Sequence, residues 1–248
     1  MPGTRSRAEE GVPLPPSDPS AEDTLDLKLP AEALALIPEE PQQERGAGRD
    51  PATGTDDRAA LLDHIAAWGP ADTPHGSFRL VPVVPARDLA LITRWMNDPA
   101  VAEFWELAGE AHITEKHLSA QLDGDGRSVP CLGVLKDIPM SYWEIYRADL
   151  DPLARYYPAR PHDTGVHLLI GGVADRARGL GSTLLRTVCG MVLEHRPACT
   201  RVVAEPDLRN TPSVSAFLTA GFRFCAEVDL PGKRAGLMIR DRALSHLM

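Results

Sequence analysis

The sequence has few cysteines and no long apolar run. Its 4 cysteines show no CxxC pair and no metal-like spacing with histidine; they are Cys131, Cys189, Cys199 and Cys225. We therefore expect free, buried thiols in a reducing cytoplasm and no metal site. No uninterrupted apolar run approaches the roughly 20 residues that span a bilayer, and the N-terminal stretch MPGTRSRAEEGVPLPP lacks the apolar segment of a secretory signal. The sequence thus predicts a cytoplasmic protein with no membrane partner.

Positive charge is also scarce. The formal net charge is −9 at pH 7 and the pI is near 5.4. A general nucleic-acid binder neutralises phosphates with clustered Lys and Arg, so we expect no nucleic-acid partner. The composition is nevertheless 43% apolar, which is enough to bury a core, and it leaves room for a local basic patch that holds one anionic cofactor.

Aromatic residues are missing from the first part of the chain. Residues 1–55 contain nine prolines and no Phe, Tyr or Trp, a composition that predicts a mostly disordered extension. Within it, residues 25–29 alternate apolar and polar side chains as a strand does. Residues 56–68 favour a short amphipathic helix followed by a linker to residue 76. We expect the remainder, residues 77–248, to form one folded domain.

Hydrophobic periodicity predicts a mixed α/β (α+β) architecture for that domain. Short apolar or alternating runs indicate strands, and apolar residues at helical spacing indicate helices. The expected strands are 77–84, 130–135, 140–146, 166–170, 200–204, 222–228 and 236–239; the expected helices are 86–97, 99–107, 114–122 with Thr114 as N-cap, 181–194 and 211–220. This order predicts a mixed sheet with helices on both faces.

One segment carries a phosphate-binding signal. Residues 167–185, HLLIGGVADRARGLGSTLL, are typical of a strand, a glycine-containing loop and a helix. Glycines let the backbone approach a ligand, while the helix start supplies unpaired amides and the positive end of its dipole. Two arginines would add charge-assisted contacts. The residues expected to hold the phosphates are Arg176, Arg178, Gly179, Leu180, Gly181 and Ser182.

The six letters RARGLG by themselves also fit a surface turn closed by glycines. The segment is not a P-loop, because GxxxxGK[ST] is missing, and the three-glycine spacing of the dinucleotide fingerprint fails. RARGLG does resemble the acetyl-CoA signature of the GNAT acyltransferases, [R/Q]-x-x-G-x-[G/A]. Residues 202–222, VVAEPDLRNTPSVSAFLTAGF, resemble the second motif of that family, in which a strand and an Asn precede a helix ending in Gly-Phe.

The resemblance covers roughly residues 77–242 and implies the GNAT fold. In that fold two neighbouring parallel strands splay apart, and the pantetheine arm of CoA lies in the gap. The resemblance therefore implies an acyl-CoA, acetyl-CoA or succinyl-CoA, as co-substrate. It also places Asn210 and Phe217 in the cofactor site. Many GNAT enzymes have a Tyr at the position of Phe217 as acid to the leaving thiolate, so here another group or water must supply that proton.

Four patches are similar to one subgroup, the siderophore-pathway acyltransferases of the aerobactin and mycobactin types. The patches are residues 96–107, 139–157, 163–172 together with 205–210, and 230–242. The resemblance implies acylation of the terminal amine or N-hydroxyamine of a lysine, ornithine or cadaverine side chain. The hydroxamate formed from an N-hydroxyamine chelates Fe³⁺ through hard oxygen ligands.

Amine attack on a thioester needs a proton acceptor, and two residues are candidates for this chemistry. His167 lies in the strand before the phosphate loop, and Asp207 follows the next strand. Imidazole titrates near neutral pH, and a neighbouring carboxylate would orient it and raise its pKa. The subgroup implied by the resemblance uses a His and an Asp at these positions. A satisfied core histidine and a turn aspartate are the structural alternatives.

Four further residues are candidates for binding the acceptor: Trp105, Trp143, Glu144 and Tyr146. Strand alternation puts Glu144 and Tyr146 on one face and Trp143 on the other. A carboxylate would suit a cationic substrate, although a half-buried strand with a solvated Glu explains the pattern as well, and helix core packing would explain Trp105. We interpret His112 and His117 as surface residues. The cluster Lys233, Arg234, Arg240 and Arg242 is interpreted as a solvated strand edge.

Two other functions fit the same motifs. One is a GNAT enzyme that acetylates an aminoglycoside or another cationic small molecule, and the other is a degenerate domain that binds acyl-CoA without transferring the acyl group. The sequence leaves open the acyl group, the carbon skeleton of the acceptor, and the choice between monomer and homodimer.

Overall fold

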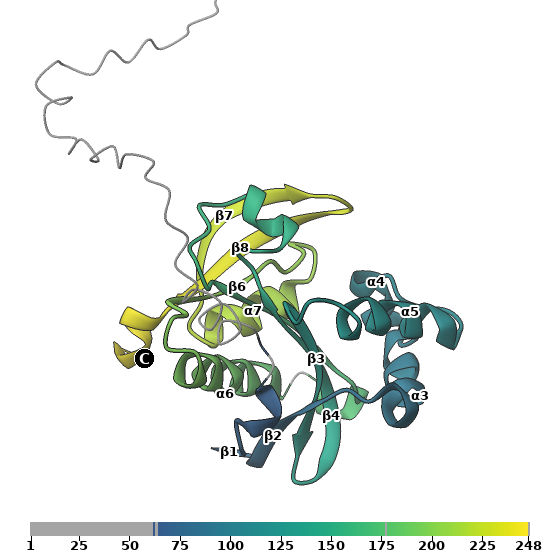
Figure 1. Ribbon diagram of the computed structural model, residues 1–248. Coiled ribbons are helices and arrows are strands. Elements are labelled where there is room, and N and C mark those ends of the chain that lie inside the picture. The colour runs from purple at the N-terminus through teal and green to yellow at the C-terminus, as the bar shows by residue number, and fades with distance from the viewer. Residues whose placement is uncertain (1–61, 63, 177, 248) are drawn as a thin grey trace, which may run out of the picture. The chain divides into compact units, whose positions relative to one another are not determined.

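The computed structural model describes residues 62, 64–176 and 178–247 (Figure 1). In this part of the chain one 8-stranded sheet has the order β1-β2-β3-β4-β5-β6-β8-β7. The strands are β1 (Ala71–Thr73), β2 (Gly76–Pro82), β3 (Ser128–Leu135), β4 (Ile138–Arg147), β5 (Thr164–Ile170), β6 (Arg201–Ala204), β7 (Arg223–Leu230) and β8 (Lys233–Asp241). All neighbours pair antiparallel except β5 and β6, which are parallel.

Helices cover both faces of the sheet, as predicted (Figure 1). The helices are α3 (Pro85–Met96), α4 (Pro99–Trp105), α5 (Ala111–Leu122), α6 (Leu180–His195) and α7 (Thr211–Thr219), with 3-10 turns η1 (Ile65–Ala67), η2 (Pro152–Arg155), η3 (Val173–Asp175) and η4 (Arg242–Leu247). None of the helices described is long and apolar enough to cross a membrane.

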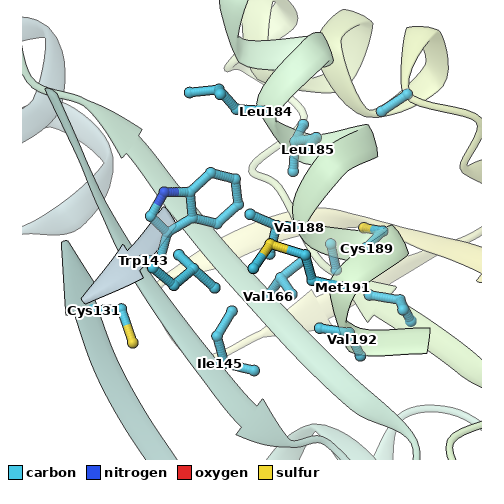
Figure 2. Packing of buried hydrophobic residues seen from close by; sticks show 14 of the residues in the cluster. Cys131, Trp143, Ile145, Val166, Leu184, Leu185, Val188, Cys189, Met191 and Val192 are labelled. Atoms are coloured by element: carbon cyan, nitrogen blue, oxygen red, sulfur yellow. The ribbon is translucent and has the colours of Figure 1, made fainter. Parts of the chain in front are cut away.

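Strand alternation divides the core into two layers. On one face, Trp143 and Ile145 of β4 pack against the apolar side of α6, which includes Leu184 and Val188 (Figure 2). On the other face, Tyr142 packs with apolar residues of α3, α4 and α5. Because successive side chains of a strand point to opposite faces, β4 supplies both layers at once.

The β3–β4 hairpin shows how local sequence sets the register. Lys136 and Asp137 at its turn have φ values of 49° and 64°, the left-handed backbone that a two-residue hairpin turn requires. The register then shifts by one residue between Gly133 and Val134, and this shift places Cys131 opposite Trp143 and Pro130 opposite Glu144. Glu144 consequently shares the face of Tyr142 and not that of Trp143.

The parallel pairing of β5 with β6 is very short. Only Thr164 with Val202 and Gly165 with Val203 are in register, after which the two strands separate. A buried ion pair joins the strands at this end, because the guanidinium of Arg201 donates to both carboxylate oxygens of Asp163 and the Nε–Oδ1 distance is 3.0 Å. A bidentate contact between buried partners fixes both position and angle. The ion pair therefore holds β5 and β6 together at this end. Toward the end of β5 the two strands separate and leave a gap between them.

Several expectations are corrected by the structure. Thr114 is not an N-cap: α5 begins at Ala111, and Thr114 is buried within it. Cys225 is exposed, whereas the other three cysteines are buried as predicted. Strand β1 was not expected. The predicted strand at 25–29 and most of the predicted helix at 56–68 lie outside the described residues.

We predict that the Asp163–Arg201 pair is a main determinant of stability. Arg201→Ala leaves the buried carboxylate of Asp163 without its cation, which should lower the free energy of unfolding by about 3–5 kcal/mol. Urea unfolding measures the change. The matched control is Arg79→Ala, which removes one partner of the exposed pair Arg79–Asp137 and should change stability little. Equal effects of the two variants would contradict the role given to the buried pair.

Candidate active site

A histidine and a glutamate face each other on neighbouring strands. The register of β4 and β5 places Glu144 directly opposite His167. Their side chains share one face of the sheet, where directly opposed residues come within contact distance. His167 Nδ1 lies 2.9 Å from Glu144 Oε2. The local cause is the antiparallel pairing of β4 with β5.

A second carboxylate reaches His167 from the other side of the gap. Glu205 follows the last residue of β6, and its Oε1 lies 2.5 Å from His167 Nε2. The second oxygen of Glu205 accepts a hydrogen bond of 2.9 Å from the hydroxyl of Tyr146. Lys233 donates to the backbone oxygen of Glu205 at 2.7 Å. The imidazole of His167 thus bridges β4 and the end of β6 across the separated strands.

The buried carboxylate of Glu144 accepts several hydrogen bonds. Glu144 Oε1 accepts from Gln121 Nε2 at 2.8 Å and Tyr142 OH at 2.9 Å, and lies 2.5 Å from His117 Nε2. Burial alone would raise the pKa of Glu144, but the hydrogen bonds from His117 and His167 hold it well below its ordinary value. The carboxylate therefore stays ionised in the folded protein.

The same charges act on the histidine. Burial lowers the pKa of His167, but the charge of Glu205 and the hydrogen bonds to Glu144 and Glu205 outweigh burial and raise the pKa to about 10. Burial would raise the pKa of Glu205, and the charge and hydrogen bond of His167 lower it. At neutral pH the cluster is accordingly an imidazolium between two carboxylates. In this state His167 can donate protons but not accept one.

Two cavities meet at this cluster. The larger cavity, about 770 Å³, lies between α5, its following loop and β4, and the smaller, about 290 Å³, lies along the free edge of β5 and reaches Glu205 and α7. His117, Glu144 and His167 line both. The side chain of His167 is 35% exposed. Molecules in the two cavities would therefore approach the imidazole from different sides.

Asp207 lines the smaller cavity, but the structure does not pair it with His167. Its carboxylate accepts from the guanidinium of Arg209, with Oδ2 at 2.7 Å from Nη2, and from the Arg209 backbone N–H at 2.8 Å. The hydrogen bond from Arg209 lowers the pKa of Asp207. Glu205 occupies the place beside the imidazole that the sequence assigned to Asp207.

Asn210 and Phe217 also line the smaller cavity. The side-chain oxygen of Asn210 accepts from Ser213 N at 3.1 Å and so caps the start of α7. This leaves its NH₂ group as the donor for a ligand. Phe217 is 5% exposed and packs edge-on against Phe222. It has no proton to give.

The predicted phosphate loop ends at the N-terminus of α6, where the first backbone amides have no intrahelical acceptor. Gly179 is the N-cap of α6 with φ 73°, and the amides of the first helical turn that follow, from Leu180 to Ser182, have no intrahelical acceptor. A methyl group added at Gly179 would meet no atom within 4 Å, and one at Gly181 would meet only Ala216 Cβ, at 4.0 Å. The absence of side chains there leaves the amides accessible.

The two arginines of the loop differ. Arg178 is exposed. Arg176 is not available to a ligand in this state, because its guanidinium donates to Asp98 Oδ1 at 2.9 Å and to the carbonyl oxygens of Ile170 and Gly171. Asp98 is the N-cap of α4, so Arg176 ties that helix to the end of β5. In this structure Arg176 supports the loop, and its predicted phosphate contact stays a prediction.

Of the residues predicted to bind the acceptor, Trp143 lines neither cavity. It is fully buried on the face of α6, and its Nε1 donates to Ser141 Oγ at 2.9 Å (Figure 2). Trp105 lines the smaller cavity with its ring 6.1 Å from that of His167. Tyr146 and Glu144 line the larger cavity. The structure thus brings Trp105, Glu144 and Tyr146 together around His167.

Sequence reasoning missed three residues of this site: His117, Glu205 and Lys233. The signal for Glu205 was present, since it lies two residues before Asp207 in the same EPD segment. His117 was interpreted as a surface residue, and its helix α5 gives no strong apolar face that would point it inward. Lys233, interpreted as part of a solvated strand edge, contacts Glu205. Arg240 from the same cluster is buried and donates to Ala220 O at 3.0 Å.

Within the described part of the chain, no group of three or more His, Cys, Asp or Glu side chains could hold a metal ion.

Comparison with known proteins identifies the family. A family model described as an acetyltransferase (GNAT) domain matches residues 84–230. The chain belongs to the GNAT acetyltransferase family. The solved structure of the aminoglycoside acetyltransferase AAC(6')-Ib in complex with coenzyme A superposes with a TM-score of 0.63 at 22% identity, over 69% of this chain and 99% of that one. At this identity the likeness shows the fold alone, and the predicted GNAT fold is confirmed.

Two relatives are closer in sequence. This GNAT protein is 38% identical to the lysine N-acyltransferase MbtK of Mycobacterium sp. (strain MCS), over 66% of this chain and 67% of that protein. It is 36% identical to the N(6)-hydroxylysine O-acetyltransferase of Escherichia coli, over 67% of this chain and 52% of that protein. Both relatives are acyltransferases named for lysine-type acceptors.

We predict that Glu205, and not Asp207, sets the charge of His167. Glu205→Gln removes the carboxylate beside Nε2 and should lower the pKa of His167 by about 1–3 units. Asp207→Asn is the matched control and should leave that pKa almost unchanged, because Asp207 is neutralised by Arg209. Titration of the histidine ring protons by NMR measures both. Equal shifts would restore Asp207 to the place that the sequence gave it.

Proposed function

We propose that this GNAT protein is an acyl-CoA-dependent N-acyltransferase for the terminal amine or N-hydroxyamine of a lysine, ornithine or cadaverine-type acceptor, acting in hydroxamate siderophore biosynthesis. The observation that carries the proposal is the meeting of two cavities at His167. One cavity follows the splayed strands and suits the thioester arm; the other is lined by carboxylates and suits a cationic acceptor. The lysine and hydroxylysine acyltransferases among its relatives support the acceptor class.

The chain fits the cofactor. Accessible amides at the start of α6 suit the pyrophosphate of CoA, and the dipole of this 16-residue helix favours an anion there. Beyond Gly165, β5 has no partner strand in register on its β6 side, so its backbone groups can pair with the amides of pantetheine. Arg178 supplies an exposed positive charge beside the loop. The smaller cavity then receives the thioester end next to Glu205 and His167.

The transfer step needs two proton movements. The acceptor nitrogen attacks the thioester carbon, and the C–S bond breaks with its electron pair on sulfur. We assign the proton lost by nitrogen to the carboxylate of Glu205, and the proton gained by sulfur to the imidazolium of His167. Transfer of the proton from Glu205 to His167 along their 2.5 Å contact restores both groups. His167 thereby supplies the leaving sulfur with the proton that Phe217 cannot supply.

An N-hydroxyamine suits this arrangement better than an alkylamine. Its conjugate acid is much more acidic than an alkylammonium, so it is neutral and nucleophilic near neutral pH. A strong base in the site is then unnecessary, in keeping with the low pKa of Glu205 and with a histidine that is already protonated.

The test is direct acyl transfer. We expect the protein to release CoA thiol from acetyl-CoA or succinyl-CoA when N-hydroxylysine, N-hydroxyornithine or N-hydroxycadaverine is present, and the acylated product to appear by mass spectrometry. Acyl-CoA alone should raise the melting temperature, since a ligand that binds only the folded state stabilises it. Turnover with kanamycin alone would favour the aminoglycoside alternative. Binding of CoA without turnover of any amine would favour the degenerate domain.

We also predict the pH dependence of the reaction. If His167 acts as the acid, kcat with an N-hydroxyamine should stay high while the imidazole is protonated and fall as the pH rises through its pKa of about 10. His167→Gln should remove this alkaline fall and reduce kcat about 10²–10⁴-fold. Steady-state kinetics from pH 6 to 10.5 provides the profile. A kcat that increases toward pH 10 would instead identify neutral His167 as a base.

A further inference from the structure

The wall of the larger cavity is rich in carboxylates. Asp123, Asp125, Glu144 and Asp151 line it, together with the guanidinium groups of Arg127 and Arg147. A lysine-type acceptor that reaches His167 through this cavity must place its far end among these groups. Their pairing therefore decides which charges the far end can carry.

Both guanidinium groups are already engaged by aspartates of the chain. Arg127 Nε lies 2.8 Å and 2.9 Å from the two oxygens of Asp125, and its Nη1 donates to Leu150 O at 3.1 Å. Arg147 donates through Nε and Nη2 to the two oxygens of Asp149, at 2.8 Å and 2.7 Å. Such two-point contacts occupy the edge of a guanidinium that would bind a carboxylate. An α-carboxylate on the acceptor would have to displace one of these aspartates.

The histidines of the cavity are engaged as well. His167 lies between Glu144 and Glu205, and His117 Nε2 contacts Glu144. Neither ring offers an unshared positive charge to an incoming carboxylate. Within the described lining of the larger cavity, an acceptor carboxylate therefore finds negative groups in excess.

Asp151, in contrast, is a carboxylate of this cavity that a cation would stabilise. Its side chain accepts a hydrogen bond from Leu153 N at 2.9 Å at the start of η2, and among the described residues it forms no ion pair. It is half-buried. Burial and the nearby negative charge of Glu205 raise its pKa, and together they outweigh the hydrogen bond from Leu153 N and the positive charges of His167 and Arg127, which lower it. A cation beside Asp151 would relieve both effects.

Resting on the proposed function, we propose that the acceptor is an α,ω-diamine whose far end is an ammonium group without a carboxylate, and that Asp151 binds this ammonium. N-Hydroxycadaverine and N6-hydroxylysine form a matched pair for this inference. The two molecules have the same five-carbon spacing between nitrogens, and they differ only by the α-carboxylate. The carboxylate is the group for which the cavity has no free partner.

The experiment compares the two hydroxylamines on the full-length protein with acetyl-CoA. We expect kcat/KM for N-hydroxycadaverine to exceed that for N6-hydroxylysine by about tenfold or more, the equivalent of one well-placed charge contact. N6-hydroxylysine amide, which lacks the negative charge, should recover most of the difference. Calorimetric titration of both hydroxylamines in the absence of acyl-CoA should give the same order of affinity.

Asp151→Asn tests the residue itself. The amide oxygen of Asn can still cap Leu153 N, so the fold should be retained, which the melting temperature checks. We expect the KM for N-hydroxycadaverine to rise about tenfold with kcat nearly unchanged, and the preference over N6-hydroxylysine to disappear. Asp229→Asn is the control for net charge, because the side chain of Asp229 is 91% exposed on β7. It should leave both substrates unaffected.

A preference for N6-hydroxylysine, or an Asp151→Asn variant that binds N-hydroxycadaverine as tightly as the parent does, would overturn the inference. These outcomes would leave the proposed function intact, since acyl transfer to a hydroxylamine would still occur. If the proposed function is wrong, neither hydroxylamine will be acylated. In that case the calorimetric order of affinities alone decides whether the cavity selects a diamine.

Discussion

The separation of β5 from β6 is the constraint on which the site depends. The strands share two register pairs and are held there by the buried Asp163–Arg201 contact. Beyond that point the chain after β6 turns to β8, where Asp207 forms a bridge with Ala235. A parallel sheet normally closes such a gap with backbone hydrogen bonds. Here the gap stays open, and it exposes the edge of β5 to a ligand.

The open gap also explains why the cluster around His167 carries so much charge. Glu144 reaches His167 from within the sheet, while Glu205 reaches it from the far side of the gap. Buried carboxylates are stable only when donors or cations satisfy them, and Tyr142, Gln121 and Tyr146 supply donors that do not titrate near neutral pH. Among the described residues, the imidazolium of His167 is the one group that contacts both carboxylates. Its protonation is therefore a consequence of how the two strands diverge.

Sequence patterns predicted the elements well, because apolar periodicity reflects the local packing that forms them. Alternation placed Glu144 and Tyr146 on the face opposite Trp143, and the structure agrees, which also removes Trp143 from the acceptor site. The choice between Glu205 and Asp207 was beyond such patterns. It depends on the residue at which β6 separates from β5. The long-range pairing of β6 with β8 determines that residue. The contact of His117 with Glu144 likewise joins two residues that lie 27 positions apart in the chain.

The predicted phosphate loop and the acidic wall of the larger cavity lie on different elements of this fold. The predicted phosphate loop belongs to the β5–α6 connection, whereas the acidic wall of the larger cavity comes from α5, its following loop and the segment after β4. The two regions share only His117, Glu144 and His167 as cavity lining. We therefore expect substitutions in the acidic wall to leave the structure of the β5–α6 connection unchanged. The side chains that differ between the two cavities therefore belong to separate elements, and Asp151, at the start of η2, lies in the acidic wall alone.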